Sequence, residues 1–281
     1  MYQGRNTLRI NQVCKEKGFL IAAHRGSVGG NIIQNSFLAY KTALLHGADL
    51  VEMDLSRSSD GVFYAFHNGV EQVIWQKDCD IREMTSQEID NMYCYNDLSL
   101  VTKRHVQRAA DVLEKLRNKC FINIDRSWYY WADSIKFLDS LDMSDQIILK
   151  SPVEDQLLEH LQDCGSKIMY MPIIKTVTDW EKVKSYNVNV VAAEVIIDSP
   201  TSNMLNPKFI KRLKDDGVLL WANTIVLDDT VVLSGLMDDN TSIEKGFDEG
   251  WGKILNHGFN ILQTDWPGLV NNYRKTYNSK F

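Results

Sequence analysis

The chain alternates short apolar runs, rich in β-branched and aromatic residues, with longer stretches whose apolar positions recur at helical spacing. Short runs bounded by turn-forming residues are typical of buried strands, and longer periodic stretches are typical of amphipathic helices. Eight strands are predicted, at residues 19–26, 49–56, 120–127, 146–151, 167–174, 189–197, 217–225 and 260–267. Helices are predicted at residues 35–46, 106–118, 127–141, 153–163, 179–186 and 207–214. A further helix is expected from Thr241, where Thr-Ser-Ile-Glu fits a capping box, to His257.

The order of these elements predicts the fold. Strands that alternate with helices indicate a parallel sheet, and eight strands close as a (β/α)8 TIM barrel, so we predict an α/β fold of this class. The interval 68–103 between the second and third strands is too long for an ordinary connection. We expect a small insertion there, with a short helix around residues 85–92. No linker or repeat interrupts the rest, so a single domain over residues 1–281 is predicted.

Two acids and a histidine stand out just before the insertion. Glu52 and Asp54 are two residues apart in a predicted strand, so both side chains project from one face. Asp60-Gly61 predicts a two-residue hairpin turn, and the register of such a hairpin sets His67 across from Asp54. From this stretch alone, a buried strand with its acids neutralised by Lys or Arg and with a structural histidine is an equally open interpretation.

Composition narrows the class of protein. The chain has 281 residues, 44% of them hydrophobic, and a formal net charge of −6, which argues against a nucleic-acid-binding surface. The five cysteines form no CxxC pair, so neither a disulfide framework nor a zinc site is predicted. Neither a signal peptide nor an apolar run of about 18 residues is present, so we expect a cytoplasmic protein without stable membrane insertion. A leader removed from the chain would make it extracytoplasmic, and the oligomeric state stays open.

The carboxyl ends of the strands are where barrels of this kind gather their active-site groups. Three acids fall there on neighbouring strands, namely Glu52, Asp54 and Asp125. Their charges would repel one another in a dry cavity unless a cation neutralised them. Because all the ligand atoms are oxygen, we expect one divalent cation, Mg²⁺ or Ca²⁺, with Mn²⁺ as an alternative.

Three further residues suggest what the cation would serve. His24 and His67 are candidates for the general acid and base, because imidazole titrates near neutral pH by type. Arg25 offers a planar fork suited to a phosphate or a carboxylate. A cation, two histidines and an arginine together predict displacement at phosphorus.

Ordered motifs along nearly the whole chain resemble those of one family, the glycerophosphodiester phosphodiesterases. The matching residues are His24-Arg25-Gly26, Asn35-Ser36, Gly47-Ala48-Asp49 before Glu52 and Asp54, Asp60-Gly61, His67, Met84-Thr85, Asn123-Ile124-Asp125, Trp221 and Thr264-Asp265-Trp266-Pro267. The resemblance implies a TIM-barrel hydrolase of lipid and glycerol metabolism, similar to the phosphatidylinositol phosphodiesterases in fold. It implies a small-molecule phosphodiester as the substrate and metal-dependent hydrolysis of glycerophosphodiesters to an alcohol and glycerol 3-phosphate.

The resemblance also assigns roles to residues. It implies that Glu52, Asp54 and Asp125 bind the metal, that His24 and His67 are the acid and base, and that Arg25 holds the phosphate. Four positions depart from the usual pattern: Asp125 for Glu, Ser127 for Lys, Asn68 for Asp and Gln34 for Glu. The change at Ser127 removes a phosphate-contacting cation. We expect Lys150, at the end of the fourth strand, to replace it in preference to Arg126, whose strand parity points it away from Asp125.

Several assignments keep an alternative. We count Trp221 among the substrate-binding residues, although barrel packing explains its position equally well. Glu194 is expected to pair with Lys150 or Lys175 inside the barrel. Asp265, before an aromatic residue and a proline, is expected to brace the last loop.

Two other functions compete with the leading one. A lysophospholipase D-like phosphodiesterase giving a cyclic phosphate would need an apolar track, which the aromatic stretch 128–131 could supply unless it packs outside the barrel. A non-catalytic barrel that binds a phosphodiester or a sugar phosphate is suggested by the missing cation at Ser127. The two histidines argue against mere binding, because binding requires neither an acid nor a base.

Overall fold

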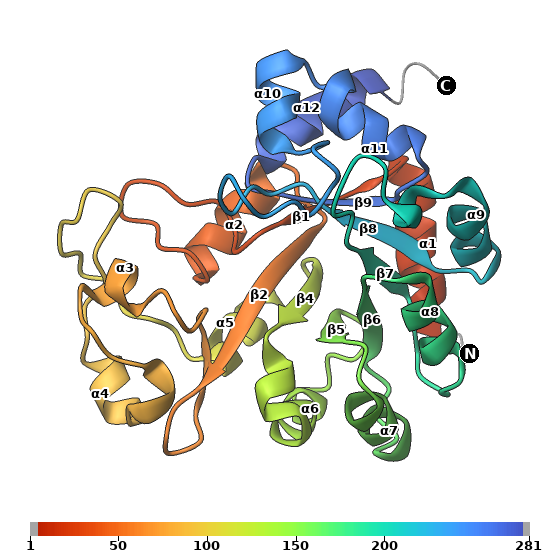
Figure 1. The fold of residues 1–281 in the computed structure, drawn as a ribbon. Helices are drawn as coiled ribbons and strands as arrows, with labels where there is room; N and C mark the ends of the chain where they lie inside the picture. The colour runs from red at the N-terminus through yellow and green to blue at the C-terminus, as the bar shows by residue number, and fades with distance from the viewer. Residues whose placement is uncertain (1–4, 278–281) are drawn as a thin grey trace.

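The computed structural model describes residues 5–277, and its centre is a closed barrel of parallel strands (Figure 1). Eight strands form it: β1 (Leu20–Ala23), β2 (Leu50–Arg57), β4 (Phe121–Asp125), β5 (Ile147–Pro152), β6 (Met169–Ile174), β7 (Ala192–Val195), β8 (Leu219–Asn223) and β9 (Ile261–Thr264). Strand β1 pairs with both β2 and β9, which closes the sheet. The predicted (β/α)8 barrel is confirmed, and each predicted strand overlaps an observed one.

Helices surround the barrel, as the periodic stretches predict. They are α2 (Phe37–Leu45), α5 (Ala109–Leu116), α6 (Trp131–Ser140), α7 (Asp155–Asp163), α8 (Val177–Lys184), α9 (Pro207–Asp215), α10 (Asp239–Lys245), α11 (Lys253–Asn256) and α12 (Pro267–Tyr277). Helix α12 was not predicted, and neither was an additional helix, α1 (Arg5–Lys17). Its residues Ile10 and Cys14 pack on the first residues of the strands, so α1 closes the end of the barrel opposite the predicted site.

The helix expected from Thr241 to His257 is wrong in its start and its continuity. Helix α10 begins two residues earlier, because the Asp238 side chain caps it by accepting a hydrogen bond from the Thr241 N–H. Gly246, with φ +110°, ends it. A π-helical turn (Asp248–Gly252) and α11 then complete the segment.

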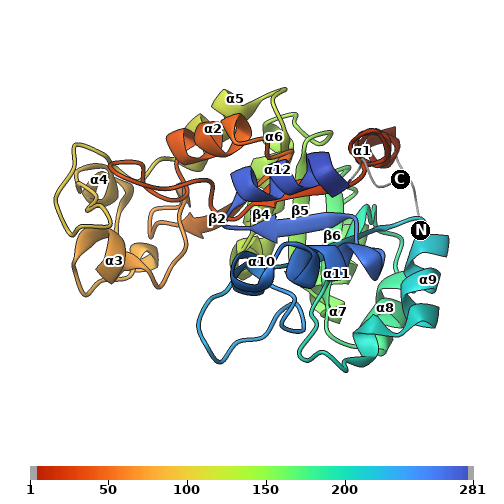
Figure 2. The same ribbon diagram turned by 90° about the horizontal axis from the view of Figure 1, so that it is seen from above.

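The insertion after β2 is built on a hairpin. Strand β3 (Phe63–Ala65) runs antiparallel to β2, and helices α3 (Glu71–Trp75) and α4 (Ser86–Asp90) follow it. Thr85 caps α4 with a full capping box, which confirms the short helix expected there. Figures 1 and 2 both show α3 and α4 projecting to one side of the barrel. A small core of the insertion's own, including the stacked rings of Phe66 and Trp75, holds this projection together.

Among the residues that the structure describes, none of the helices combines the length and the apolar character that crossing a membrane would require.

Candidate active site

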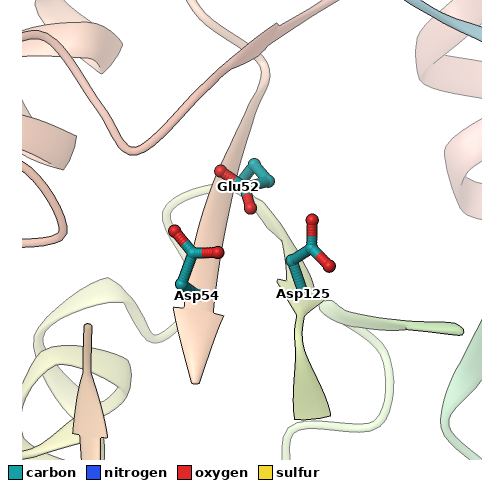
Figure 3. Close-up of side chains that lie close together, drawn as sticks. All are labelled: Glu52, Asp54 and Asp125. Atoms are coloured by element: carbon teal, nitrogen blue, oxygen red, sulfur yellow. The ribbon is translucent and has the colours of Figure 1, made fainter. Parts of the chain in front are cut away.

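Three carboxylates meet at the carboxyl ends of β2 and β4. Glu52 and Asp54 project from the same face of β2, and Asp125, the last residue of β4, is in register with Asp54. One ligand oxygen from each residue lies within 4.8 Å of the other two. Figure 3 shows the three side chains gathered between the two strands. Glu52 and Asp54 are each only 1% exposed, so their charges are poorly screened by water.

The first turn after β1 lays Arg25 over this cluster. The backbone N–H of Arg25 donates to Oε2 of Glu52 at 3.0 Å, and its Nε lies 3.0 Å from Oδ2 of Asp54. Both Arg25 and Gly26 adopt positive φ angles, +52° and +84°. A Cβ at Gly26 would come within 2.6 Å of the Ala39 backbone, so the turn requires glycine there. The backbone conformation of the His-Arg-Gly motif thus directs the Arg25 guanidinium toward the acids.

Asn35 anchors Asp54 from another side. Its amide donates to Oδ2 of Asp54 at 2.9 Å, and its carbonyl oxygen accepts from the Asp54 backbone N–H and from the Tyr40 hydroxyl. Burial opposes the charge on Asp54, but Arg25, His67 and Asn35 outweigh burial and lower the pKa of Asp54. The family resemblance included Asn35 in a motif, and the structure shows that this residue holds Asp54 in place.

Glu52 has the opposite balance. Burial, followed by the charges of Asp54 and Asp125, raises the pKa of Glu52 well above its ordinary value. Glu52 and Asp54 are buried and Asp125 is partly buried, and the cations against them are Arg25 and Lys150, which leaves an excess of negative charge. A hard divalent cation fits both the excess charge and the all-oxygen donor set. Glu52, Asp54 and Asp125 are the residues that could hold it.

His24 extends from the end of β1 toward the last strand. Its Nδ1 lies 2.8 Å from Oδ1 of Asp265, which follows β9. Its backbone N–H donates to the carbonyl of Thr264. Asp265 was expected only to brace the last loop, and the structure shows it against the ring of a predicted catalytic residue.

The hairpin register predicted for His67 is wrong by one residue. Leu55 pairs with Ala65, and the Phe66 N–H donates to the Asp54 carbonyl, so Phe66 and not His67 lies opposite Asp54. The loop has three residues and ends on Gly61 with φ +91°, a common three-residue hairpin geometry.

His67 nevertheless stays beside the acids, because β3 ends at Ala65 and strand parity no longer governs its side chain. Burial lowers the pKa of His67; Arg25 and Arg126 add to the effect, and Asp54 opposes it. Its Nδ1 is buried and has no hydrogen-bond partner among the described residues.

Lys150 is a buried ion-pair partner of the carboxylates. Its Nζ lies 2.5 Å from Asp125 and 3.0 Å from Glu194, and the residue is 2% exposed. Burial opposes its charge, but Asp125 and Glu194 outweigh burial and raise the pKa of Lys150. The pairing expected between Glu194 and Lys150 is confirmed.

Trp221 lies in the barrel interior, below the surface of the site. It is fully buried, packs in the cluster of residues that fills the interior, and donates its indole N–H to Asn223 at 2.9 Å. Of the two roles left open by the sequence, the structure shows packing. It gives no surface of Trp221 to a substrate.

Arg126 is the residue whose direction was predicted from strand parity. It follows the end of β4 in the left-handed region, with φ +57°, so the parity of the strand does not apply to it. Its Nε donates to Oδ1 of Asn68 at 2.9 Å, next to His67. The predicted strand extended to residue 127, so no sequence signal placed Arg126 beyond the strand end, where alternation does not set the direction of a side chain.

A cavity of ≈ 590 Å³ opens beside the site and reaches it through His24 and Arg25. Its apolar walls come from three separate segments: Val28 after β1, Val73 and Tyr95 in the insertion, and Trp266 after β9. The aromatic stretch 128–131 does not line it. Trp131 packs in the outer core and Tyr130 packs on Phe63, which confirms that this stretch packs outside the barrel.

The fold and the site together define an α/β barrel with a buried acidic cluster, two histidines and an arginine at its mouth. A family model described as a domain of unknown function matches residues 170–274. Many solved structures share the fold. A glycerophosphoryl diester phosphodiesterase from Parabacteroides distasonis has a TM-score of 0.76 at 16% identity, over 92% of this chain and 87% of that one.

Two further structures give the same result. A glycerophosphodiester phosphodiesterase from Agrobacterium tumefaciens has a TM-score of 0.65 at 20% identity, over 90% of this chain and 99% of that one. A phosphodiesterase from Oleispira antarctica, in complex with its product sn-glycerol-3-phosphate, has a TM-score of 0.64 at 12% identity, over 90% and 95% of the two chains. The protein therefore has the barrel fold of the glycerophosphodiester phosphodiesterases.

Proposed function

We propose that this protein is a metal-dependent glycerophosphodiester phosphodiesterase that releases an alcohol and glycerol 3-phosphate. The observation that carries the proposal is the buried cluster of Glu52, Asp54 and Asp125, with Arg25 bridging two of its members. Structures of the same fold that bear this enzymatic name, one of them holding sn-glycerol-3-phosphate, support the same substrate class.

The acids are proposed to hold one divalent cation, Mg²⁺ or Ca²⁺. When bound, such an ion would neutralise negative charge on the phosphate and withdraw electrons from phosphorus. Arg25, already 3.0 Å from Asp54, presents its guanidinium to a phosphate oxygen from the same side. These contacts orient the phosphodiester and offset the charge that grows during displacement.

Two protons must move during the hydrolysis. The oxygen of water forms a bond to phosphorus while the bond from phosphorus to the alcohol oxygen breaks. We assign the base to His67, because burial lowers its pKa and so favours the neutral ring, which can accept a proton. His24 then gives a proton to the departing alkoxide, with Asp265 fixing the orientation of its ring.

For the second phosphate-binding cation, Arg126 is better supported than the predicted Lys150. The amine of Lys150 is buried between Asp125 and Glu194. Arg126 is only partly buried, and its Nε contacts Asn68, the residue after His67. A guanidinium offers two parallel donors to a phosphate, whereas the lysine usual in the family at position 127 would offer a single ammonium group.

The test is release of glycerol 3-phosphate from a glycerophosphodiester by the purified protein. We expect exhaustive chelation to abolish it and added Mg²⁺ or Ca²⁺ to restore it. His24→Ala and His67→Ala should lose turnover and keep calorimetric binding of the cation, whereas His160→Ala, on α7, serves as the control. Tight binding of the diester without turnover would instead favour the non-catalytic barrel.

The apolar cavity supports a second candidate, a phosphodiesterase of the lysophospholipase D type that acts on diesters with an apolar alcohol. Its ≈ 590 Å³ exceeds what a glycerol-sized group fills and lies in the usual range for a larger organic ligand. Comparison of kcat/KM for a glycerophosphodiester and a lysophospholipid decides between the two. Val73→Asp should lower only the second value if the cavity binds the apolar group.

A further inference from the structure

Asp239, the first residue of α10, has no role in the proposed reaction. It is 1% exposed, yet it carries a carboxylate. We propose that Asp239 is a positioning residue that holds Asp265 in place as the hydrogen-bond partner of His24. This inference rests on the proposed function, in which His24 is the general acid.

Four donors converge on the Asp239 carboxylate. Thr224 Oγ1 at 2.7 Å and Trp251 Nε1 at 2.8 Å donate to Oδ1. Thr264 Oγ1 at 2.8 Å and the backbone N–H of Asp265 at 3.0 Å donate to Oδ2. An ionised carboxylate accepts all four bonds, whereas an amide would turn its N–H groups toward Trp251 Nε1–H or toward the Asp265 N–H, neither of which can accept a hydrogen bond. An amide at this position therefore loses at least one of the four bonds.

The network leads directly to His24. The carbonyl of Thr264 accepts the backbone N–H of His24 at 3.1 Å, and Oδ1 of Asp265 lies 2.8 Å from its Nδ1. The main chain and the ring of His24 are thus both attached to residues that Asp239 holds. The Asp265 side chain is 45% exposed, so packing does little to fix its position. The hydrogen bond from the Asp265 backbone N–H to Asp239 therefore holds this residue in place.

The ring orientation of His24 is what this arrangement fixes. A carboxylate at Nδ1 selects the tautomer that carries a proton on Nδ1 and leaves Nε2 for the substrate. If Asp239 loses its hold on Asp265, both the tautomer and the direction of the ring become variable. Asp239 acts through Asp265 and does not itself touch the reacting atoms.

Asp239→Asn is the test, with Asp216→Asn as the matched control. Asp216 also accepts an indole N–H, from Trp180 at 2.8 Å, but lies at the end of α9. We expect Asp239→Asn to lower kcat roughly 10- to 100-fold with little change in KM, and the control to leave kcat unchanged. In an Asp265→Ala background, Asp239→Asn should cost almost nothing further. An equal loss in both backgrounds, or no loss in a folded variant, would overturn the proposal.

A second readout does not depend on activity. In protein labelled with ¹⁵N-histidine, the His24 signals, identified by their absence in His24→Ala, should report the Nδ1–H tautomer. Asp239→Asn should give a mixture and the Asp216 control should not. Should Asp239→Asn fail to fold, Thr264→Val removes one bond to Oδ2 and should shift the tautomer in the same direction. An unchanged tautomer contradicts the positioning role, whereas absence of any phosphodiester turnover in the wild type contradicts only the proposed function.

Discussion

Replacement of Lys150 by methionine should strongly destabilise the protein. The change leaves Asp125 and Glu194 without the cation that lies 2.5 and 3.0 Å from them. Removal of one partner from a buried ion pair typically costs about 3–5 kcal/mol, because the remaining charge is neither paired nor hydrated. Lys150 is 2% exposed and its partner Glu194 3% exposed, so solvent screening gives little relief, and we expect a loss within that range.

The chain supplies a matched control in Lys182, whose Nζ lies 3.0 Å from Asp155, the same distance as in the Lys150–Glu194 pair. This pair is exposed, so Lys182→Met should change the free energy of unfolding far less. Urea denaturation followed by tryptophan fluorescence, in the presence of a chelator, measures both variants. Divalent cation should then restore more stability to Lys150→Met than to the wild type, because the cation replaces the lost charge. Equal losses for the two variants would refute the reasoning.

Three further predictions concern stability and binding. Burial raises the pKa of Asp239 to about 7, whereas the same group in an unfolded chain has a pKa of about 4. Protonation of Asp239 therefore stabilises the native state below pH 4, and this stabilisation should be lost as the pH rises through 7. Denaturation at pH 5 and pH 8 should show a decrease of about 2–3 kcal/mol in the free energy of unfolding, which Asp239→Asn abolishes. Gly26→Ala should cost about 2–4 kcal/mol in the same assay, because its Cβ would meet the Ala39 backbone at positive φ. Arg126→Ala should raise KM for a glycerophosphodiester about tenfold, as expected for one charge-assisted hydrogen bond, whereas Arg117→Ala should not.

The hairpin of β2 and β3 shows where prediction from sequence ends. Alternation along β2 placed Glu52 and Asp54 on one face, and the structure agrees, because parity holds inside a regular strand. The register across the turn failed by one residue, because Asp-Gly is compatible with both two- and three-residue loops. His67 lies near the acids because β3 ends at Ala65, which the hairpin register does not predict.

The direction of Lys150 could be predicted from the sequence and that of Arg126 could not, for a related reason. Lys150 lies within β5, so its inward direction was predictable, and its pairing with Glu194 followed from it. Arg126 lies one residue beyond β4 with a positive φ, and its direction depends on a turn that the sequence does not specify. Local periodicity determines directions inside elements and says nothing about the residue after them.

The sequence by itself determined the eight strands, their alternation with helices, and the set of acids, histidines and arginine at the strand ends. Those features are local, because hydrophobic spacing and turn chemistry act over a few residues. Only the tertiary structure decided that Lys150 also pairs with Asp125, that Trp221 packs inside the barrel, and that Asp239 is linked to His24 through Asp265. Such contacts join residues far apart in the chain, and their geometry exists only when the barrel has closed.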